Sequence, residues 1–309
     1  MSDAMSDAMS DAAPDLAQDA GPMRSTLDPL RQVTSGVVRW RGATSGETRD
    51  ELVAEEPLEI RARPSGSGAT PQTIAVIMRT PGHDDELAMG FLLSEGLIMR
   101  ADEIAALDSG LDDDGLPSPN IIEVVSAAGL DLSQRMRESG YSRQFAVNSS
   151  CGVCGKNTVE AACALLPPVP LDGFNVAPAT LYRLPDRLRA EQRVFSATGG
   201  LHGAALFDGA GQMVTVREDV GRHNAVDKLV GHALLAGQAP LGERILLVSG
   251  RLSFEIVLKA LVARIPIVAA VSAPSSLAID LARSGGVTLV GFLRGESCNV
   301  YTWPERVRG

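Results

Sequence analysis

Hydrophobic positions in the first half of the chain follow the pattern of a mixed α/β module. Residues 73–79 form a nearly continuous apolar strand, and shorter runs predict strands over 36–40, 58–62 and 121–125. After a turn, the acidic residues 84–86 open a predicted helix, because negative charge stabilises a helix N-terminus. Residues 108–119, which are rich in Asp, Gly and Pro, predict a loop.

Strands and helices alternate in the second half of the chain. Four segments have helical spacing: 159–166, 226–234, 254–262 and 275–283. Asn224 is the predicted N-cap of the second of these helices. Five segments are predicted strands, the first two joined as a hairpin: 204–207, 213–216, 245–248, 267–271 and 287–292. The alternation predicts a mostly parallel sheet covered on both faces, whose ligands bind beyond the carboxyl ends of the strands.

These patterns predict three parts. Residues 1–32 begin with Met-Ser-Asp-Ala written three times, and we expect them to form a disordered acidic tail because they have little apolar surface to bury. An N-terminal α+β module covers 33–144. A larger α/β domain covers 145–309 and begins with a polar connector that carries two cysteines. The length of 309 residues agrees with about two folded domains.

Composition and charge narrow the range of partners. The net charge of −10 argues against a protein that binds nucleic acid non-specifically or lies on an anionic membrane. No apolar stretch approaches the roughly 18 residues of a membrane helix, and the N-terminus lacks the pattern of a secretion signal. Four cysteines are too few for a disulfide framework, which favours reduced thiols and a cytoplasmic location.

The motif CGVCGK, from Cys151 to Lys156, is the strongest local signal for chemistry. Glycines next to both Cys151 and Cys154 predict a flexible loop, and the nearby lysine favours the reactive thiolate. Three chemistries fit: a redox dithiol, half of a zinc site, or a carrier that accepts sulfur as a persulfide. A zinc site would need further ligands, yet Cys163 and Cys298 are isolated in the sequence.

Basic residues occur at several turns of the predicted sheet. Arg222 and His223 open a predicted helix, Arg251 follows one predicted strand, and Arg294 follows another. Three arginines at turns of one sheet, in an otherwise acidic protein, indicate a polyanionic ligand such as a dinucleotide pyrophosphate. His202, in a glycine-rich turn, is a further candidate. Ordinary solvated turns are the alternative, and the glycine fingerprints of Rossmann and P-loop sites are absent.

Six ordered segments closely resemble the FdhD family, the sulfurtransferases that formate dehydrogenase activity requires: SSCGVCGK, FSATGGLHGAALFD, VREDVGRHNAVDKLVG, LLVSGRLSFEIVLKAL, IPIVAAVSAPSSLAIDLA and GVTLVGFLRGESCNVYT. The amino-terminal module is also similar, through EEPLEIR and VIMRTPGHDDELAMGFLLSEGLI. The resemblance covers nearly everything from about Val33 to Trp303. It implies a cytidine-deaminase-like three-layer α/β main domain with a smaller N-terminal α+β module, and it implies a homodimer.

The resemblance also implies a reaction and assigns residues to it. A cysteine desulfurase supplies sulfur to Cys151 as a persulfide, and Cys154 matches the second cysteine, whose role stays open. The sulfur then passes to molybdenum cofactor, as the bis-molybdopterin guanine dinucleotide, before its insertion into formate dehydrogenase. GDP is a further expected ligand. The cofactor segment matches Phe292, Leu293, Arg294, Gly295, Glu296 and Ser297, and the predicted site also includes Arg222, His223 and Arg251.

The deaminase likeness can be compared with the residues. Zinc deaminases carry H-x-E, where the glutamate moves protons, and a later P-C-x-x-C that binds zinc. Segments 223–225 and 249–251 stand where these motifs would fall, and they contain neither the glutamate nor the cysteines. No metal site is therefore expected, and we infer that the vacated pocket holds a guanine nucleotide.

Two other functions stay open at this point. A non-catalytic chaperone would bind the molybdenum cofactor and apo-formate dehydrogenase without using Cys151. A dithiol oxidoreductase would form a reversible Cys151–Cys154 disulfide and would depend equally on both cysteines.

Overall fold

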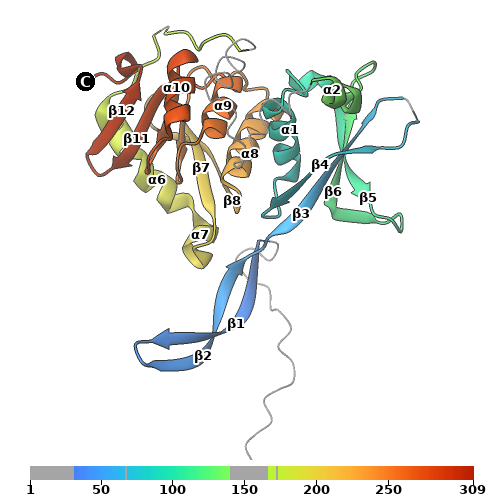
Figure 1. The fold of residues 1–309 in the computed structure, drawn as a ribbon, viewed down its shortest axis with the longest axis horizontal. Helices are drawn as coiled ribbons and strands as arrows, with labels where there is room; N and C mark the ends of the chain where they lie inside the picture. Colours follow the sequence, from blue (N-terminus) through green and yellow to red (C-terminus); the bar gives the residue numbers. More distant parts are fainter. Residues whose placement is uncertain (1–30, 67, 140–165, 172) are drawn as a thin grey trace, which may run out of the picture.

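A computed structural model describes residues 31–66, 68–139, 166–171 and 173–309. They form a mixed α/β protein with three sheets, which confirms the predicted class (Figure 1). Residues 1–30, most of the helix predicted over 159–166, and both cysteines of the CGVCGK motif lie outside the described residues. The cytidine-deaminase-like architecture and the boundary between residues 144 and 145 stay predictions.

Four strands form the sheet of the N-terminal region, in this order: β4 (Gln72–Arg79), β3 (Glu56–Pro64), β6 (Pro117–Ser126) and β5 (Ile104–Leu111). Alternate residues of β3, namely Leu58, Ile60 and Ala62, are buried, as expected for a strand with one face on a core. They join one hydrophobic cluster with residues of helix α1 (Asp84–Ser94), and helix α2 (Leu132–Ser139) also packs near β3. The short 3-10 helix η1 (Ala101–Glu103) precedes β5.

The loop predicted over 108–119 is wrong. Strand β5 continues to Leu111 and β6 begins at Pro117, so the turn between them covers only residues 112–116. The Asp112 Oδ1 closes this turn by accepting hydrogen bonds from the backbone N–H groups of Asp114, at 3.0 Å, and Leu116, at 2.9 Å. The ends of both strands next to this turn are exposed, so they can contain turn-forming residues. A proline is also tolerated as the first residue of a strand, as Pro117 is in β6.

A two-stranded arm projects from the body of the molecule (Figure 1). Its strands β1 (Gln32–Arg41) and β2 (Thr44–Val53) pair in antiparallel register along their whole length. The sequence predicted only part of β1 and missed β2. Nearly every position of β2 is polar, so this strand shows no alternation of apolar and polar residues. Val38 and Trp40 are 59% and 67% exposed, so the arm presents apolar surface to solvent.

The larger sheet has six strands, in this order: β12 (Ser297–Thr302), β11 (Thr288–Arg294), β10 (Ile267–Ala270), β9 (Ile245–Val248), β7 (His202–Phe207) and β8 (Met213–Asp219). Only the β9–β10 and β10–β11 pairings are parallel, so the prediction of a mostly parallel sheet is wrong. Tight hairpins join β7 to β8 and β11 to β12, and a tight turn can connect only antiparallel neighbours.

Helices cover both faces of this sheet. On one face lie α8 (Arg222–Leu235), α9 (Phe254–Val262) and α10 (Ser276–Ser284), and their apolar residues share a cluster with Leu246 and Val268. On the other face lie α5 (Pro178–Tyr182) and α6 (Leu184–Glu191), packed against Phe207 and Leu247. Helix α7 (Arg193–Thr198) leads into β7, and the 3-10 helix η2 (Pro304–Arg306) follows β12.

The predicted N-cap of α8 is also wrong, because the helix begins earlier. Gly221 is the N-cap and Arg222 the first helical residue. Asn224 lies inside the helix, where its Nδ2 donates hydrogen bonds to Met78 O at 2.8 Å and Asp219 Oδ1 at 2.9 Å. The residue type suited a cap, but tertiary contacts with β4 and β8 use its side chain instead.

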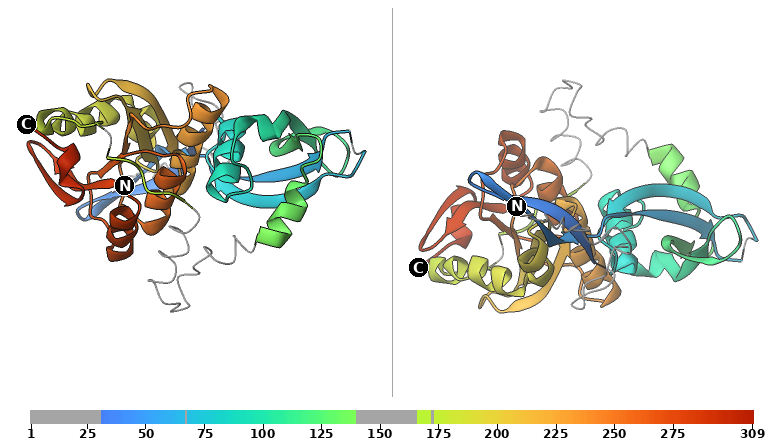
Figure 2. Two further views of the ribbon diagram at one scale, coloured as in Figure 1. Left: turned by 90° about the horizontal axis from the view of Figure 1, so that it is seen from above. Right: turned by 90° about the horizontal axis from the view of Figure 1, so that it is seen from below.

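Helices α1 and α8 hold the two large sheets together (Figure 2). They touch through backbone: a Cβ added at Gly90 would lie 1.9 Å from Asp227 O, and one added at Gly231 would lie 1.8 Å from Glu86 O. Because both contacting positions are glycine, one hydrophobic cluster runs without a break from β3 through α1 to α8.

A buried ion pair reinforces this junction. Lys228 Nζ lies 2.6 Å from Asp219 Oδ2, and both side chains are 0% exposed. Lys228 also donates to Thr80 O at 2.8 Å, while Asp219 accepts from the backbone N–H groups of Thr80 and Gly221. The pKa of Lys228 is lowered, because burial outweighs the opposing effect of Asp219. The network ties the turn after β4 to the start of α8.

Glu86 on α1 forms ion pairs with β8 and α8, and these pairs predict that the stability of the fold depends on pH. Its carboxylate pairs with Arg217, with His83 at 3.4 Å and with His232 at 3.0 Å. Burial alone would raise the pKa of Glu86, but hydrogen bonds from Arg217 and His83 and their charges lower it to about 2. Because the pKa in the folded state lies below the ordinary glutamate value of 4.5, this carboxylate stabilises the fold above pH 4.5.

We therefore expect the stabilisation from Glu86 to be lost as the pH falls from about 5 toward 2, from about 3 kcal/mol at pH 7 to about 1 kcal/mol at pH 3. Urea unfolding at a series of pH values would measure it. Glu86→Gln should flatten the decline in the free energy of unfolding over this range, and Glu305→Gln, at an exposed position, should not. An unchanged decline in Glu86→Gln would contradict the assignment.

Candidate functional site

Four strands of the large sheet end at one edge and define the candidate site. Strand β7 is antiparallel to both β8 and β9, so β8 and β9 run in the same direction. Strands β10 and β11 are parallel to β9 and share that direction. Helices α8, α9 and α10 begin where β8, β9 and β10 end. Gly221, Ser253 and Ser275 are their N-caps, and Ser275 Oγ accepts a hydrogen bond from the backbone N–H of Ala278. Three positive helix ends therefore face this edge, as a bound anion requires.

The three predicted arginines lie along this edge. Arg222 starts α8, Arg251 follows β9, and Arg294 ends β11. Strands β8 and β11 are four positions apart in the sheet, with β9 midway, and neighbouring strands are spaced about 4.8 Å apart. The three arginine positions therefore form a row that spreads over about 19 Å of the sheet's width rather than one compact cluster. Such a row matches an extended polyanion better than a single phosphate group.

Two histidines lie among these arginines. His223 Nε2 is 3.3 Å from Ser253 Oγ and 3.9 Å from Glu255. His202 begins β7, and a Cβ added at Gly250 would lie 3.5 Å from its Nδ1. Burial lowers the pKa of both imidazoles, and the charge of Arg222 lowers it further, so both rings are neutral at pH 7. Neutral imidazoles at this edge can each donate and accept a hydrogen bond.

Segment 292–297 forms the tip of the β11–β12 hairpin. Arg294 pairs with Ser297, and Gly295 and Glu296 make the turn. These four residues are exposed, and the Arg294 guanidinium lies 6.0 Å from the Phe292 ring. Leu293 differs, because its side chain is fully buried in the hydrophobic cluster under α5 and α6. Only its backbone can contact a ligand, whereas the rest of the segment presents side chains to solvent.

Cys151 and Cys154 lie outside the described residues, so their position relative to this edge stays a prediction. The described residues contain no group of three or more His, Cys, Asp or Glu side chains that could hold a metal ion. Among the same residues, the helices are too short or too polar to cross a bilayer.

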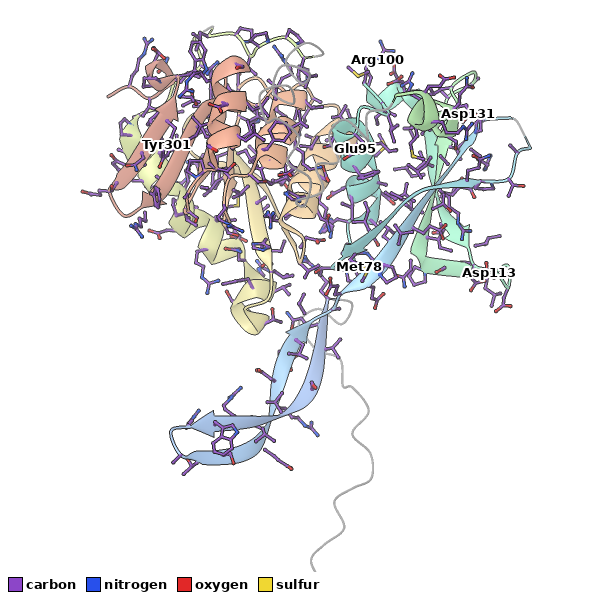
Figure 3. All side chains as sticks on the ribbon, viewed as in Figure 1. Met78, Glu95, Arg100, Asp113, Asp131 and Tyr301 are labelled. Atoms are coloured by element: carbon purple, nitrogen blue, oxygen red, sulfur yellow. The ribbon has the colours of Figure 1, made fainter. Side chains whose placement is uncertain are left out.

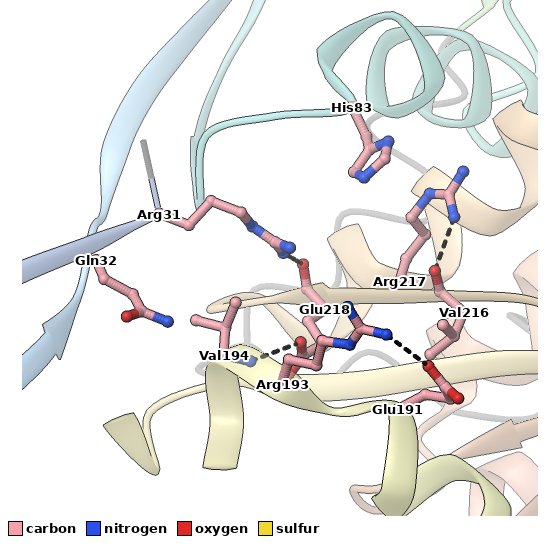
Figure 4. A pocket seen from close by; sticks show the side chains of 9 residues that line it. All are labelled: Arg31, Gln32, His83, Glu191, Arg193, Val194, Val216, Arg217 and Glu218. Atoms are coloured by element: carbon pink, nitrogen blue, oxygen red, sulfur yellow. Dashed lines mark hydrogen bonds and ion pairs between the residues drawn. The ribbon is translucent and has the colours of Figure 1, made fainter. Parts of the chain in front are cut away.

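A polar cavity of about 420 Å³ lies outside β8, at the root of the arm (Figure 4). Its arginines are engaged with the protein: Arg31 Nη2 donates to Glu218 O and Arg217 Nη1 to Val216 O, both at 2.7 Å. The Glu218 carboxylate accepts from the backbone N–H of Val194 at 3.1 Å. These side chains cover an edge strand, which prevents a further strand from adding to it. We therefore place the functional site at the carboxyl edge and not here.

A second cavity, of about 340 Å³, opens beside His223 between α1, α8 and α9. Its polar residues Glu95, Asp227 and Lys259 were not included in the predicted site. Glu95 directly follows α1, Asp227 lies in α8 and Lys259 in α9, so no single short motif contains all three. His202 was noticed in its glycine-rich turn but was not included in the predicted site.

Comparison with known proteins agrees with the motifs at this edge. The model of the FdhD/NarQ family matches residues 53–308. The chain is 50% identical over 280 residues to the sulfur carrier protein FdhD of Streptomyces avermitilis, covering 88% of this chain and 94% of that protein. It is 44% identical over 271 residues to that of Sulfurisphaera tokodaii, covering 88% and 97%.

A solved structure shares the architecture. The crystal structure of a protein described as a formate dehydrogenase accessory protein, from Desulfotalea psychrophila, matches with a TM-score of 0.67 and 26% identity. The match covers 90% of this chain and all of that one. A family model that spans nearly every described element, together with relatives of about half-identical sequence, shows that the chain belongs to the FdhD/NarQ family.

Proposed function

We propose that this protein is a sulfurtransferase of formate dehydrogenase maturation. It accepts sulfur from a cysteine desulfurase as a persulfide on Cys151 and transfers it to molybdenum cofactor, in the bis-molybdopterin guanine dinucleotide form, before the cofactor enters formate dehydrogenase. The observation that carries the proposal is the CGVCGK motif in a chain 50% identical to a sulfur carrier protein. The proposed location is the cytoplasm.

The first step needs only a reactive thiolate. The Cys151 thiolate attacks the terminal sulfur of the persulfide on the desulfurase, the S–S bond of the donor breaks, and the donor cysteine leaves as a thiolate. Cys151 then carries the extra sulfur. The glycine that follows each cysteine and the positive charge of Lys156 favour this exchange.

The carboxyl edge suits the acceptor in charge and in length. The acceptor carries two pyrophosphate groups, and Arg222, Arg251 and Arg294 lie in a row with three helix N-termini. Exposed residues of segment 292–297 supply further contacts, and a guanine nucleotide such as GDP would bind through the same groups. The net charge of −10 disfavours polyanions that cannot reach this edge.

Sulfur loading of single-cysteine variants tests the proposal. After incubation with a cysteine desulfurase and cysteine, intact mass spectrometry without reductant should find one added sulfur atom on the wild type and none on Cys151→Ser. Formate dehydrogenase activity in cells should fall to background with Cys151→Ser. The same assay on Cys154→Ser would show whether the second cysteine assists.

Cys298→Ser is the matched control for loading. Cys298 is half-buried on β12, and burial raises the pKa of its thiol, so it should carry no sulfur. Normal loading and normal formate dehydrogenase activity in Cys151→Ser would overturn the proposal.

The second candidate function is a chaperone that binds the molybdenum cofactor and apo-formate dehydrogenase without carrying sulfur. The row of arginines favours it as much as it favours the first candidate, because both need the cofactor bound. The chaperone predicts that Arg294→Glu loses function while Cys151→Ser retains it. A homodimer also stays a proposal, and the exposed Val38 and Trp40 of the arm support it as apolar surface that a second subunit would cover.

A further inference from the structure

The arginine row carries positive charges that no protein group pairs. Arg251 and Arg294 are exposed and Arg222 is half-buried. Within the described part of the chain, none of these three guanidinium groups forms a hydrogen bond or an ion pair. Arg217, by contrast, is paired with Glu86. Three unpaired cations beside three positive helix ends attract any acidic group that can reach them.

The N-terminal segment of the chain has the opposite charge. Residues 1–30 contain six aspartates and one arginine, so a tenth of the chain carries half of the net charge of −10. Five of these aspartates recur at every fourth position: Asp3, Asp7, Asp11, Asp15 and Asp19. The match to the FdhD/NarQ family begins only at residue 53, so the family's function does not account for this acidic segment.

The acidic segment joins the body of the protein next to the arginine row. Arg31 is the first described residue, and its Nη2 donates to Glu218 O at 2.7 Å (Figure 4). Glu218 precedes Arg222 by four residues, which span at most about 14 Å. Met78 lies close to the point where the arm leaves the body (Figure 3), and its backbone oxygen accepts a hydrogen bond from Asn224 Nδ2 in the first turn of α8. The acidic segment therefore begins beside the helix end that carries the first arginine of the row.

The length of the segment lets all five repeated aspartates reach the row. Asp19 is 12 residues from Arg31, and Asp3 is 28 residues from it. For the disordered chain that the sequence predicts, these separations correspond to root-mean-square distances of about 19 Å and about 29 Å. The row itself spreads over about 19 Å. Because the aspartates are tethered, their local concentration at the row is millimolar, which compensates for the weakness of single exposed ion pairs.

We propose that the arginine row is an interaction surface for the acidic segment 1–30, which occupies the row when no polyanionic ligand is bound. A ligand with a pyrophosphate group displaces the aspartates, because its bidentate pairs with arginine are stronger than single carboxylate contacts. Anions that bind weakly are excluded, so the segment acts as a competitor that selects for the tighter ligand. The inference rests on the proposed function for the identity of that ligand, and it adds the regulation of the same site.

Modification of arginine by phenylglyoxal tests this contact in the full-length protein without any ligand. An asparagine variant replaces the five repeated aspartates and removes their charge, and a glutamate variant replaces the same five and keeps it. At about 50 mM salt, peptide mass spectrometry should find Arg251 and Arg294 modified about threefold faster in the asparagine variant than in the wild type or the glutamate variant. At about 1 M salt the difference should vanish, because the screening length is then only about 3 Å. Arg283, at the other end of α10 from the row, is the internal control and should react at the same rate in all three proteins.

Isothermal titration with inorganic pyrophosphate measures the competition. At about 50 mM salt the asparagine variant should bind pyrophosphate about threefold more tightly than the wild type does. A control variant loses four exposed carboxylates that lie away from the carboxyl edge: Asp113→Asn, Asp114→Asn, Glu243→Gln and Glu305→Gln. It should bind pyrophosphate as the wild type does, because its lost charges are not tethered to the row.

Three results would overturn the proposal. The first is equal modification of Arg251 and Arg294 in the wild type and the asparagine variant. The second is faster modification confined to Arg41 and Arg49, since the acidic segment would then lie on the arm. The third is an equal gain in pyrophosphate affinity in the asparagine and control variants, since net charge alone would then explain it. Failure of the proposed function is seen separately, because sulfur loading on Cys151 depends on neither the row nor the segment.

Discussion

Gly231→Ala is expected to destabilise the protein by about 3 kcal/mol, even though alanine is the better helix former by about 1 kcal/mol. The added Cβ would lie 1.8 Å from the backbone oxygen of Glu86 and 2.8 Å from the backbone nitrogen of Gly90. Backbone atoms cannot move aside as a flexible side chain can. Helices α1 and α8 would therefore separate, which loosens the hydrophobic cluster that both share.

Urea unfolding at pH 7 would measure this loss. Gly242→Ala is the matched control, because an added Cβ there meets no atom within 4 Å, and it should change the free energy of unfolding by less than about 0.5 kcal/mol. The contact between α1 and α8 would be refuted by a Gly231→Ala protein as stable as the wild type.

Lys228→Met is expected to cost about 3–5 kcal/mol, the range found when one partner of a buried ion pair is removed. Methionine is apolar and similar in length, so the packing changes little, but Asp219 keeps a charge with no exposed surface. The backbone oxygen of Thr80 also loses its donor. Because these groups tie the turn after β4 to α8, the loss should weaken the junction between the two sheets.

The same unfolding experiment checks this prediction. Arg283→Met breaks the pair with Asp280, in which both side chains are more than half exposed, and should cost less than about 1 kcal/mol. If the free energies of unfolding of the two variants differ by less than about 1 kcal/mol, the buried Lys228–Asp219 pair stabilises the protein no more than an exposed pair does.

Local patterns were reliable where an element has one buried face, as β3 does, or is a short apolar run buried on both faces, as β9 is. Strands β3 and β9 and helices α9 and α10 were predicted from their periodicity, with errors of a few residues at their ends. The arm strand β2 escaped detection because it packs against no core and so carries no apolar alternation. The loop at 108–119 failed for the opposite reason, since turn-forming residues there belong to paired strands.

The candidate site shows the same division. Arginines at the carboxyl ends of β8, β9 and β11 could be placed on one edge from the strand-and-helix order alone, and the structure places them there. The proposal that they bind a cofactor stays a prediction. The cavity of Glu95, Asp227 and Lys259 could not be predicted, because its residues come from α1, α8 and α9 and meet only after these helices have packed.

By itself the sequence determined the α/β class, the family and the chemistry available, because motifs and periodicity are local properties of the chain. Only the tertiary structure decided that the sheet is mixed, that α1 and α8 touch through glycines, that Leu293 is buried, and that an acidic cavity adjoins the arginine row. These features depend on contacts between residues distant in the chain, and such contacts form only when buried surfaces fit one another.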